Sequence, residues 1–412
     1  MPSNAALKRG ADLYILFIIW PFLAFLMALK NFHQKNSRVI VLLFLVLYGF
    51  TYIVFDPAMD GYRRAEYFAG FAAQPFSEFF NVFGSFIAFG DRLDIVEPFL
   101  QFLVSRFTID YRYVFAVYAL VFGFFYLKSI HMLHSRFREH KNINAQFILL
   151  LFIFILPIFH INGFRMWTAT WVFFYGAYHV VLYRDRKYFL LSLFSVLIHF
   201  SFWAPNAILF IYFFLGNRNN IYFPLMVASF ILVEFPMVQA FLFNVGEYLG
   251  GGFQAEIEAY ASDHSHERVV AGQETRRWFQ AIPFLFYFLL LAVAVARYGW
   301  RNHTRIPDLE NLYSFILLFL SFSNFFSPIL AGGRFRTVFY LFAATYVFIS
   351  FIKIRARKIH WLTITGLFPV ALTILLSIRI FGNTINAWIF SPSISLIVGP
   401  PVSFYEFLRS IL

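Results

Sequence analysis

The 412-residue chain contains no cysteine and few charged residues. The absence of cysteine excludes disulfides, thiolate catalysis, iron–sulfur clusters and cysteine-based zinc sites. Only 13% of the residues are charged, whereas soluble globular chains carry roughly 25%. The chain instead contains 62 phenylalanines, and 60% of its residues are apolar. A soluble particle of this size cannot bury so much apolar surface, so we predict a membrane protein.

The formal net charge is +12. In a soluble protein such a surplus would suggest nucleic acid as a partner. In a membrane protein it has a simpler cause, because lysine and arginine collect in the cytoplasmic loops. We therefore expect the lipid bilayer, and no nucleic acid, as a partner.

Apolar runs that approach the ~20 residues needed to cross a bilayer recur along the whole chain. The predicted spans are 11–29, 38–55, 112–128, 146–162, 165–183, 188–201, 203–215, 221–245, 277–297, 309–328, 334–352 and 360–377. Pro205 lies at the junction of the two shortest, 188–201 and 203–215, which we interpret as a tight hairpin. Whether the proline-containing stretch 385–400 spans the membrane or lies at its interface stays open. We predict an all-α polytopic integral membrane protein, a single domain over residues 1–412 with about 11–13 transmembrane helices.

The basic residues of the short loops all fall on one side of this topology. They are Lys30, Lys35, Arg38, Lys128, Arg136, Arg138, Lys141, Arg184, Arg186, Lys187, Arg218, Arg297, Arg301, Arg305, Lys353, Arg355, Arg357 and Lys358. By the positive-inside rule this side is cytoplasmic, with Lys8 and Arg9 as the exception. The opposite face carries two long loops, 56–111 and 246–276, in which we expect amphipathic helices. The active face is therefore predicted to be extracytoplasmic.

Arginines stand at the outer ends of two predicted spans. Arg165 begins the span 165–183, and Arg334 and Arg336 begin the span 334–352. We expect all three in the first turn of a helix, where free N–H groups favour anions and the guanidinium binds phosphate oxygens in bidentate fashion. The alternative is that they only reach the lipid headgroups. We favour diphosphate binding, with Arg63 and Arg64 of the first loop as further candidates.

Three outer-face residues are candidates for a general base, namely Glu97, Asp60 and His199. A carboxylate or an imidazole can accept a proton from a sugar hydroxyl. Each has a structural alternative. Either carboxylate could form an ion pair with a neighbouring arginine, and the histidine could be hydrogen-bonded at the tip of the hairpin.

Aromatic residues beside the carboxylates of the two outer loops favour carbohydrate binding, with Tyr62 and Tyr260 as candidates. Tyr340 of the span 334–352 is a third candidate. Glu234, two residues before a proline within a span, is assigned a structural role. The Asp-His-x-His-Glu run at 263–267 resembles a metal site in composition only. We expect neither a metal nor a cofactor.

The chain has no internal repeat and its polar residues concentrate at one face, which argues against a transporter.

Several short motifs follow one another in a characteristic order. They are Asp-x-x-x-Asp-Gly-Tyr at 56–62, Glu-Pro-Phe-Leu at 97–100, the outer Arg165, Ile-His-Phe-Ser at 198–201, and Arg-Phe-Arg at 334–336 followed by Tyr340. This order resembles the EpsG-like group of Wzy-type polysaccharide polymerases over about residues 56–340. In that group a glutamine follows the outer arginine, whereas here Met166 follows Arg165. The resemblance implies a glycosyltransferase with a GT-C-like helical architecture in the bacterial inner membrane.

The resemblance also implies the reaction and its partners. Oligosaccharide repeat units carried on undecaprenyl diphosphate, both donor and acceptor, would be joined into O-antigen or exopolysaccharide at the periplasmic face. A chain-length regulator protein is a candidate further partner. The nearest alternative is an O-antigen ligase, which shares the substrate and the face and differs only in the acceptor. A flippase or other transporter of lipid-linked oligosaccharide and a membrane acyltransferase are more distant alternatives.

Overall fold

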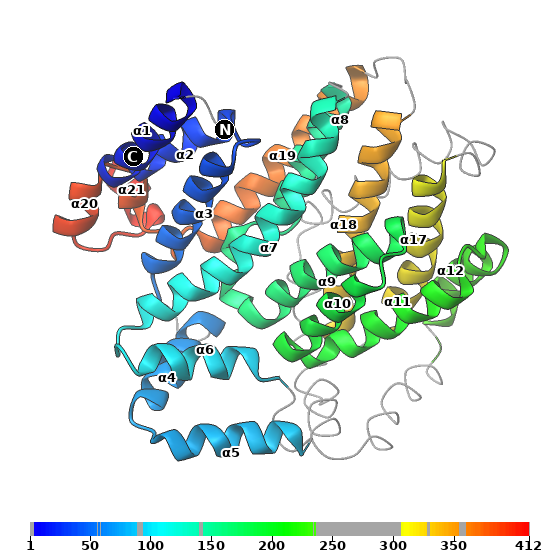
Figure 1. Cartoon of the computed structure of the whole chain (residues 1–412), viewed down its shortest axis with the longest axis horizontal. Coiled ribbons are helices and arrows are strands. Elements are labelled where there is room, and N and C mark those ends of the chain that lie inside the picture. Colours follow the sequence, from blue (N-terminus) through cyan, green and yellow to red (C-terminus); the bar gives the residue numbers. More distant parts are fainter. Residues whose placement is uncertain are drawn as a thin grey trace.

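The computed structural model describes residues 4–55, 57, 59–88, 94–139, 143–233, 235, 306–327, 330–353 and 360–411. Within these ranges the chain is helical, and its one β feature is an isolated bridge between Asn386 and Ser403. Three described stretches are long and apolar enough, by length and composition, to cross a membrane: Tyr111–Phe137, Ile143–Tyr183 and Arg334–Lys353. Shorter apolar helices pack around them (Figure 1). The predicted all-α polytopic membrane fold is confirmed.

The first predicted span, 11–29, is wrong as a single helix. It is divided into α1 (Asn4–Ile19) and α2 (Pro21–Lys30), which are separated by Trp20 in a non-helical conformation. The proline explains the break, because its ring clashes with the carbonyl four residues earlier, whereas it fits the first position of a new helix. The next helix, α3 (Lys35–Phe50), packs antiparallel on α7 (Tyr111–Glu139).

The middle of the chain forms paired helices that are joined by short 3₁₀ turns. In order these are α8 (Ile143–Ile155), η1 (Ile158–Gly163), α9 (Phe164–Tyr183), α10 (Lys187–Ile198), η2 (Phe200–Phe202) and α11 (Trp203–Leu215). The predicted pair 188–201 and 203–215 is indeed two helices, but the turn precedes Pro205. This proline lies in the first turn of α11, where its missing N–H costs no helical hydrogen bond. The Asn206 amide ties the two helices together by donating to Ser192 O (3.3 Å) and Ser195 Oγ (3.1 Å).

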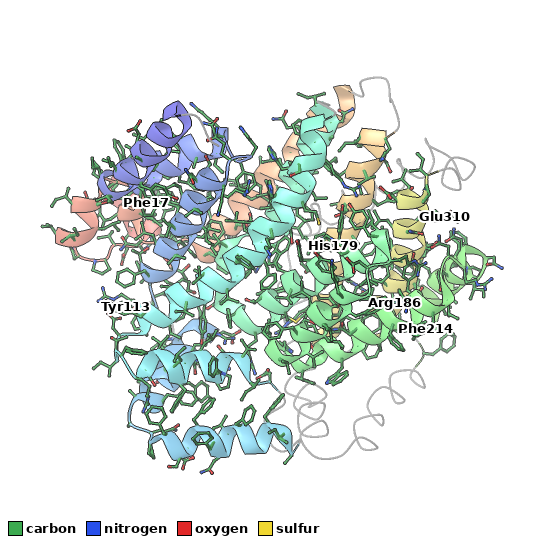
Figure 2. The ribbon with its side chains drawn as sticks, in the orientation of Figure 1. Phe17, Tyr113, His179, Arg186, Phe214 and Glu310 are labelled. Atoms are coloured by element: carbon green, nitrogen blue, oxygen red, sulfur yellow. The ribbon has the colours of Figure 1, made fainter. Side chains whose placement is uncertain are left out.

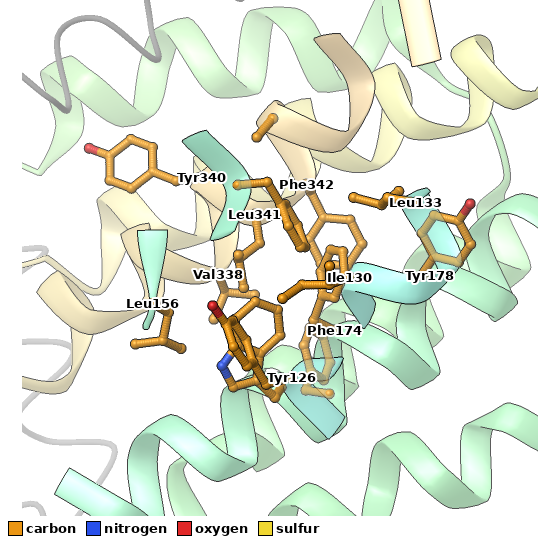
Figure 3. Packing of buried hydrophobic residues seen from close by; sticks show 14 of the residues in the cluster. Tyr126, Ile130, Leu133, Leu156, Phe174, Tyr178, Val338, Tyr340, Leu341 and Phe342 are labelled. Carbon is orange, nitrogen blue, oxygen red and sulfur yellow. The ribbon is translucent and has the colours of Figure 1, made fainter. Parts of the chain in front are cut away.

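Three more helices, α12 (Asn219–Leu232), α17 (Pro307–Phe325) and α18 (Leu330–Lys353), complete the main bundle. The first two run parallel, since the side chains of Asn219 and Ser229 bond those of Ser314 and Asn324 respectively. Aromatic and aliphatic side chains of α7, α9 and α18 pack together in the core (Figure 3). In this core the ring centroids of Phe174 and Phe342 lie 4.9 Å apart.

The C-terminal segment folds back on the N-terminal helices, and both ends of the chain lie on the same side of the molecule (Figure 1). It contains α19 (His360–Phe381), η4 (Ala387–Phe390), α20 (Ser393–Val398) and α21 (Phe404–Ile411). Trp20 Nε1 donates to Phe390 O at 3.0 Å, and Ser393 Oγ donates to Ile18 O at 2.6 Å. The open question about 385–400 is thereby answered, because α20 is only about 9 Å long and cannot cross ~30 Å of hydrocarbon.

The two ends of the bundle differ in character. At one end Arg136 bonds Asp308 (3.2 Å) and the Tyr183 hydroxyl, and Arg184 donates to Phe213 O (3.0 Å), so that α7, α9, α11 and α17 meet. This is the end predicted to be cytoplasmic. Phe214 is exposed at this end, near Arg186 (Figure 2), and exposed apolar side chains such as Leu193 and Phe210 lie between the ends.

The opposite end carries the helices of the first predicted loop. They are α4 (Asp60–Ala72), α5 (Phe76–Ile87) and α6 (Val96–Ser105), which group together beside the start of α7 (Figure 1). The second predicted loop, 246–276, lies outside the described residues. So do Tyr260, Glu234, the run 263–267 and the predicted span 277–297.

Candidate active site

Helix α4 turns one charged residue inward. Its buried positions are Gly61, Arg64, Phe68 and Phe71, a spacing that places them on one face of the helix. The guanidinium of Arg64 therefore lies on the same side as two buried aromatic rings. Burial lowers the pKa of Arg64 from its ordinary value, because the charge is held away from water.

Asn162 of η1 fixes the start of α4. Its Oδ1 accepts hydrogen bonds from the Gly61 N–H at 2.8 Å and from the Tyr52 hydroxyl at 3.0 Å. Its main-chain oxygen accepts from Arg64 Nε at 3.0 Å. A Cβ at position 61 would lie only 2.8 Å from Asn162 Oδ1, so the close approach requires glycine there. This one residue thus orients both the helix and its inward arginine.

Three side chains donate to the carboxylate of Glu97, which lies in the first turn of α6. Arg64 Nη1 forms an ion pair with its Oε1, Arg165 Nε lies 3.2 Å from its Oε2, and the Tyr118 hydroxyl donates to Oε1 at 3.1 Å. Gln101 Nε2 donates in turn to the Tyr118 hydroxyl at 2.7 Å. Residues from α4, α6, α7 and α9 thus converge on a carboxylate that is 10% exposed.

Arg165, in the first turn of α9 as predicted, bridges two carboxylates. Besides Glu97 it contacts Asp94, with Nη1 at 3.0 Å from Oδ2 and 3.3 Å from Oδ1. Asp94 is held near the end of α10 because the next N–H, of Ile95, donates to Leu197 O at 3.0 Å. The Arg165 side chain is 38% exposed, so a molecule outside the protein can reach it.

These residues surround an open cavity of about 320 Å³. Its lining is Asp60, Arg63, Arg64, Tyr67, Phe71, Asp94, Glu97, Pro98, Gln101 and Arg165. The three carboxylates and three guanidiniums of this lining balance to formal neutrality. Asp60 pairs with Arg63 at 2.5 Å, so every lining arginine contacts a carboxylate.

The structure brings five of the predicted site residues together at this cavity. These are Asp60, Glu97, Arg63, Arg64 and Arg165. The ion-pair alternative is also realised for both carboxylates, since each binds one of the two adjacent arginines of α4. The candidate bases and the candidate diphosphate-binding arginines of this cavity are therefore paired with each other, and their charges cancel.

His199 lies at the turn between α10 and α11, as predicted, and is buried behind the cavity. Its Nδ1 accepts from the Ser201 N–H at 3.3 Å and lies 3.0 Å from Ser201 Oγ. The charges of Arg165, Arg334 and Arg64 all act on the imidazole. It belongs to the same polar region without lining the cavity.

The first-turn expectation is wrong for Arg334 and Arg336. Helix α18 begins at Leu330, so both arginines lie in its second turn, where the backbone N–H groups are already bonded within the helix. Arg334 is half-buried toward His199, whereas Arg336 is exposed. Neither lines the cavity.

The predicted tyrosines do not meet at this cavity. Tyr62 is half-buried on α4 and is not part of the lining. Tyr340 is buried on α18, and its ring centroid lies 5.4 Å from that of Phe339. Reasoning from the sequence missed Asp94 and Asn162. A signal for the former was its position only three residues before Glu97.

Among the described residues, no group of three or more His, Cys, Asp or Glu side chains is arranged to hold a metal ion. A model of the EpsG family matches residues 73–390 of the chain. The match includes Asp94, Glu97 and Arg165, and it begins just after the arginines of α4. No curated protein and no solved structure matches the chain.

Proposed function

Because the chain belongs to the EpsG family, whose role is of the polysaccharide polymerase type, we propose that it joins oligosaccharide repeat units carried on undecaprenyl diphosphate. The reaction takes place at the extracytoplasmic face of the bacterial inner membrane. The observation that carries the proposal is the Glu97 carboxylate held between Arg64 and Arg165 in an open cavity.

The reaction has two chemical requirements. An acceptor sugar hydroxyl must lose its proton as its oxygen bonds to C1 of the donor sugar. The bond from C1 to the diphosphate breaks, and undecaprenyl diphosphate leaves with the electron pair. A carboxylate meets the first requirement, and positioned guanidiniums meet the second by stabilising the charge that develops on the leaving group.

The ion pairs assign different roles to the two arginines. Arg64 is buried and held by Asn162, so it stays with Glu97 and keeps the carboxylate in place. Arg165 is partly exposed, and its contacts with Asp94 and Glu97 can be exchanged for phosphate oxygens, which bind a guanidinium in the same bidentate geometry. When Arg165 binds the diphosphate instead, Oε2 of Glu97 loses a hydrogen-bond donor. Glu97 can then take the proton from the acceptor hydroxyl, so substrate binding makes the carboxylate available as a base.

A gel profile of surface glycan from a host that lacks this gene tests the proposal. Loss of the long-chain ladder, with lipid core that still bears one repeat unit, is the expected result. Loss of all repeat units from the core, with accumulation of lipid-linked polymer, would identify a ligase instead. An unchanged ladder would contradict polymerisation, and loss of repeat units without lipid-linked polymer would indicate transport.

A further inference from the structure

A second cleft continues from the ionic cavity along the exposed side of α4. It has a volume of about 420 Å³ and is lined by Arg63, Glu66, Tyr67, Gly70, Phe71 and Gln74. Three of these residues, Arg63, Tyr67 and Phe71, also line the ionic cavity. The two hollows therefore share a wall, and the part of the second that lies on the helix, from Arg63 to Phe71, extends roughly 12 Å at 1.5 Å per residue. Among the residues assigned from the sequence, only Arg63 lies in this cleft.

Gly70 keeps this cleft open. It lies inside α4, where glycine costs about 0.5–1 kcal/mol relative to alanine. No atom of the described residues comes within 4 Å of the position that its Cβ would occupy. Packing within the described chain thus does not require the glycine, unlike Gly61 of the same helix. Its side of the helix faces the open cleft, so the space is available to a ligand.

Contacts of Arg106 hold the C-terminal end of α4, which lines the cleft. Arg106 donates to Gln74 O at 2.8 Å and to Phe71 O, which holds the end of α4. The same guanidinium lies 4.4 Å from the centroid of the Phe102 ring, so α4 is fixed on α6. The cleft is therefore formed before a ligand arrives, which reduces the entropic cost of binding.

The chemistry of the lining fits carbohydrate. Tyr67 is 65% exposed and presents a flat ring, on which the apolar C–H face of a pyranose can pack. Glu66 and Gln74 provide oxygen acceptors and an amide donor for hydroxyl groups, and Arg63 adds further donors. A purely apolar ligand would leave these polar groups unpaired.

We propose that this cleft is an oligosaccharide subsite, which holds the sugars of the lipid-linked substrate while its diphosphate occupies the ionic cavity. The inference rests on the proposed function, since it takes the sugar chain of that same substrate as the ligand. Tyr67 is the stacking platform, and Gly70 is the position at which the sugar comes closest to the helix backbone.

Two pairs of variants test the subsite in a host that lacks the chromosomal gene. Gly70→Leu fills the cleft, whereas Gly84→Leu adds the same side chain at an exposed glycine of α5 that also has open space around it among the described residues. Tyr67→Ala removes the proposed stacking ring, whereas Tyr113→Ala removes an exposed ring at the start of α7 that lines neither hollow. We expect Gly70→Leu and Tyr67→Ala to reduce polymer about tenfold at equal membrane abundance, and the two partner variants to stay near wild type.

Wild-type glycan ladders in both Gly70→Leu and Tyr67→Ala would overturn the subsite, as would an equal loss in Gly84→Leu. Failure of the proposed function gives a different result, because the host that lacks the gene would then keep its glycan ladder or accumulate lipid-linked polymer. If Gly70→Leu lowers membrane abundance, the tyrosine pair decides the question alone, since an exposed ring can be removed without disturbing the core.

A binding measurement separates the subsite from the diphosphate site. The probe is the free repeat-unit oligosaccharide, released from the host's own surface polysaccharide, added to the full-length protein in nanodiscs. We expect Arg165→Ala to bind this lipid-free probe like wild type and Gly70→Leu to bind it at least tenfold more weakly. Equal binding by wild type and Gly70→Leu would contradict the assignment.

Discussion

Arg64 and Glu97 form an ion pair in which the two side chains are only 11% and 10% exposed. Taking both charges out of water is costly, and the attraction between them compensates only when further hydrogen bonds satisfy both groups. Here Asn162 O accepts from the guanidinium, and the Tyr118 hydroxyl donates to the carboxylate. These hydrogen bonds offset the cost of burial, so the pair holds the Glu97 carboxylate at the wall of an open cavity.

Glu97→Gln tests the role of that carboxylate. The amide has nearly the same shape but cannot accept a proton, so we expect polymer formation to fall by at least about 100-fold, the lower range for loss of a general base. The change also leaves the buried Arg64 without its counter-charge, which should destabilise the fold by about 3 kcal/mol or more. Glycan gels and thermal unfolding of the purified protein measure the two effects.

The double variant Arg64→Met, Glu97→Met separates these effects. It removes both charges together, so the thermal stability is expected to return toward the wild-type value while polymer formation stays absent. Recovery of polymer in this double variant would show that the carboxylate serves only the fold.

Arg165→Ala is expected to abolish polymer while membrane insertion is retained. Loss of one positioned donor to a developing negative charge costs roughly 100- to 1,000-fold in rate. Arg112→Ala is the matched control, because Arg112 also pairs with an aspartate near the outer end of a helix but is exposed and lines no described cavity. Glycan of wild-type length in a well-expressed Arg165→Ala variant would contradict the diphosphate assignment.

Asn162 is expected to act by positioning. Its Oδ1 only accepts hydrogen bonds, so Asn162→Asp keeps both the Gly61 and the Tyr52 contacts, whereas Asn162→Leu loses them. We expect the leucine variant to lower polymer formation about tenfold and the aspartate variant to retain most of it. Rates measured on purified protein at saturating substrate would show this loss in kcat. Equal activity of the two variants would exclude the positioning role.

Arg136 joins three helices at the opposite end, through Asp308 and Tyr183. Arg136→Ala is therefore expected to lower the unfolding temperature without changing the length of the glycan that the protein makes. Thermal unfolding and a glycan gel normalised to protein amount check this expectation. A shortened glycan would mean that the two ends of the bundle are coupled.

The fold class followed from composition, because a chain with 62 phenylalanines and few charges has only lipid as a suitable environment. The positions of helices were also predictable where apolar runs were long. The break at Trp20 was missed because the apolar run continues through Pro21, so that composition alone does not mark it. The early start of α18 was missed because Leu330 to Gly333 lack the strong apolar signal of the later span.

The sequence predicted several residues of the site but not the contacts between them. Glu97 and Arg165 stood out as charges at the predicted outer boundary of an apolar chain. The contact between them could not be read from the sequence, because it depends on how α6 and α9 pack. Asn162 gave no signal, since a neutral amide becomes important only through the segments it happens to join.

The most direct test of the account is a reaction with the purified full-length protein in proteoliposomes. The substrate is a single undecaprenyl-diphosphate-linked repeat unit, and no other protein is added. The account predicts products of two or more units with stoichiometric release of undecaprenyl diphosphate, and loss of both with Glu97→Gln and with Arg165→Ala. Unchanged single units with the wild-type protein, or equal product from Glu97→Gln, would contradict it.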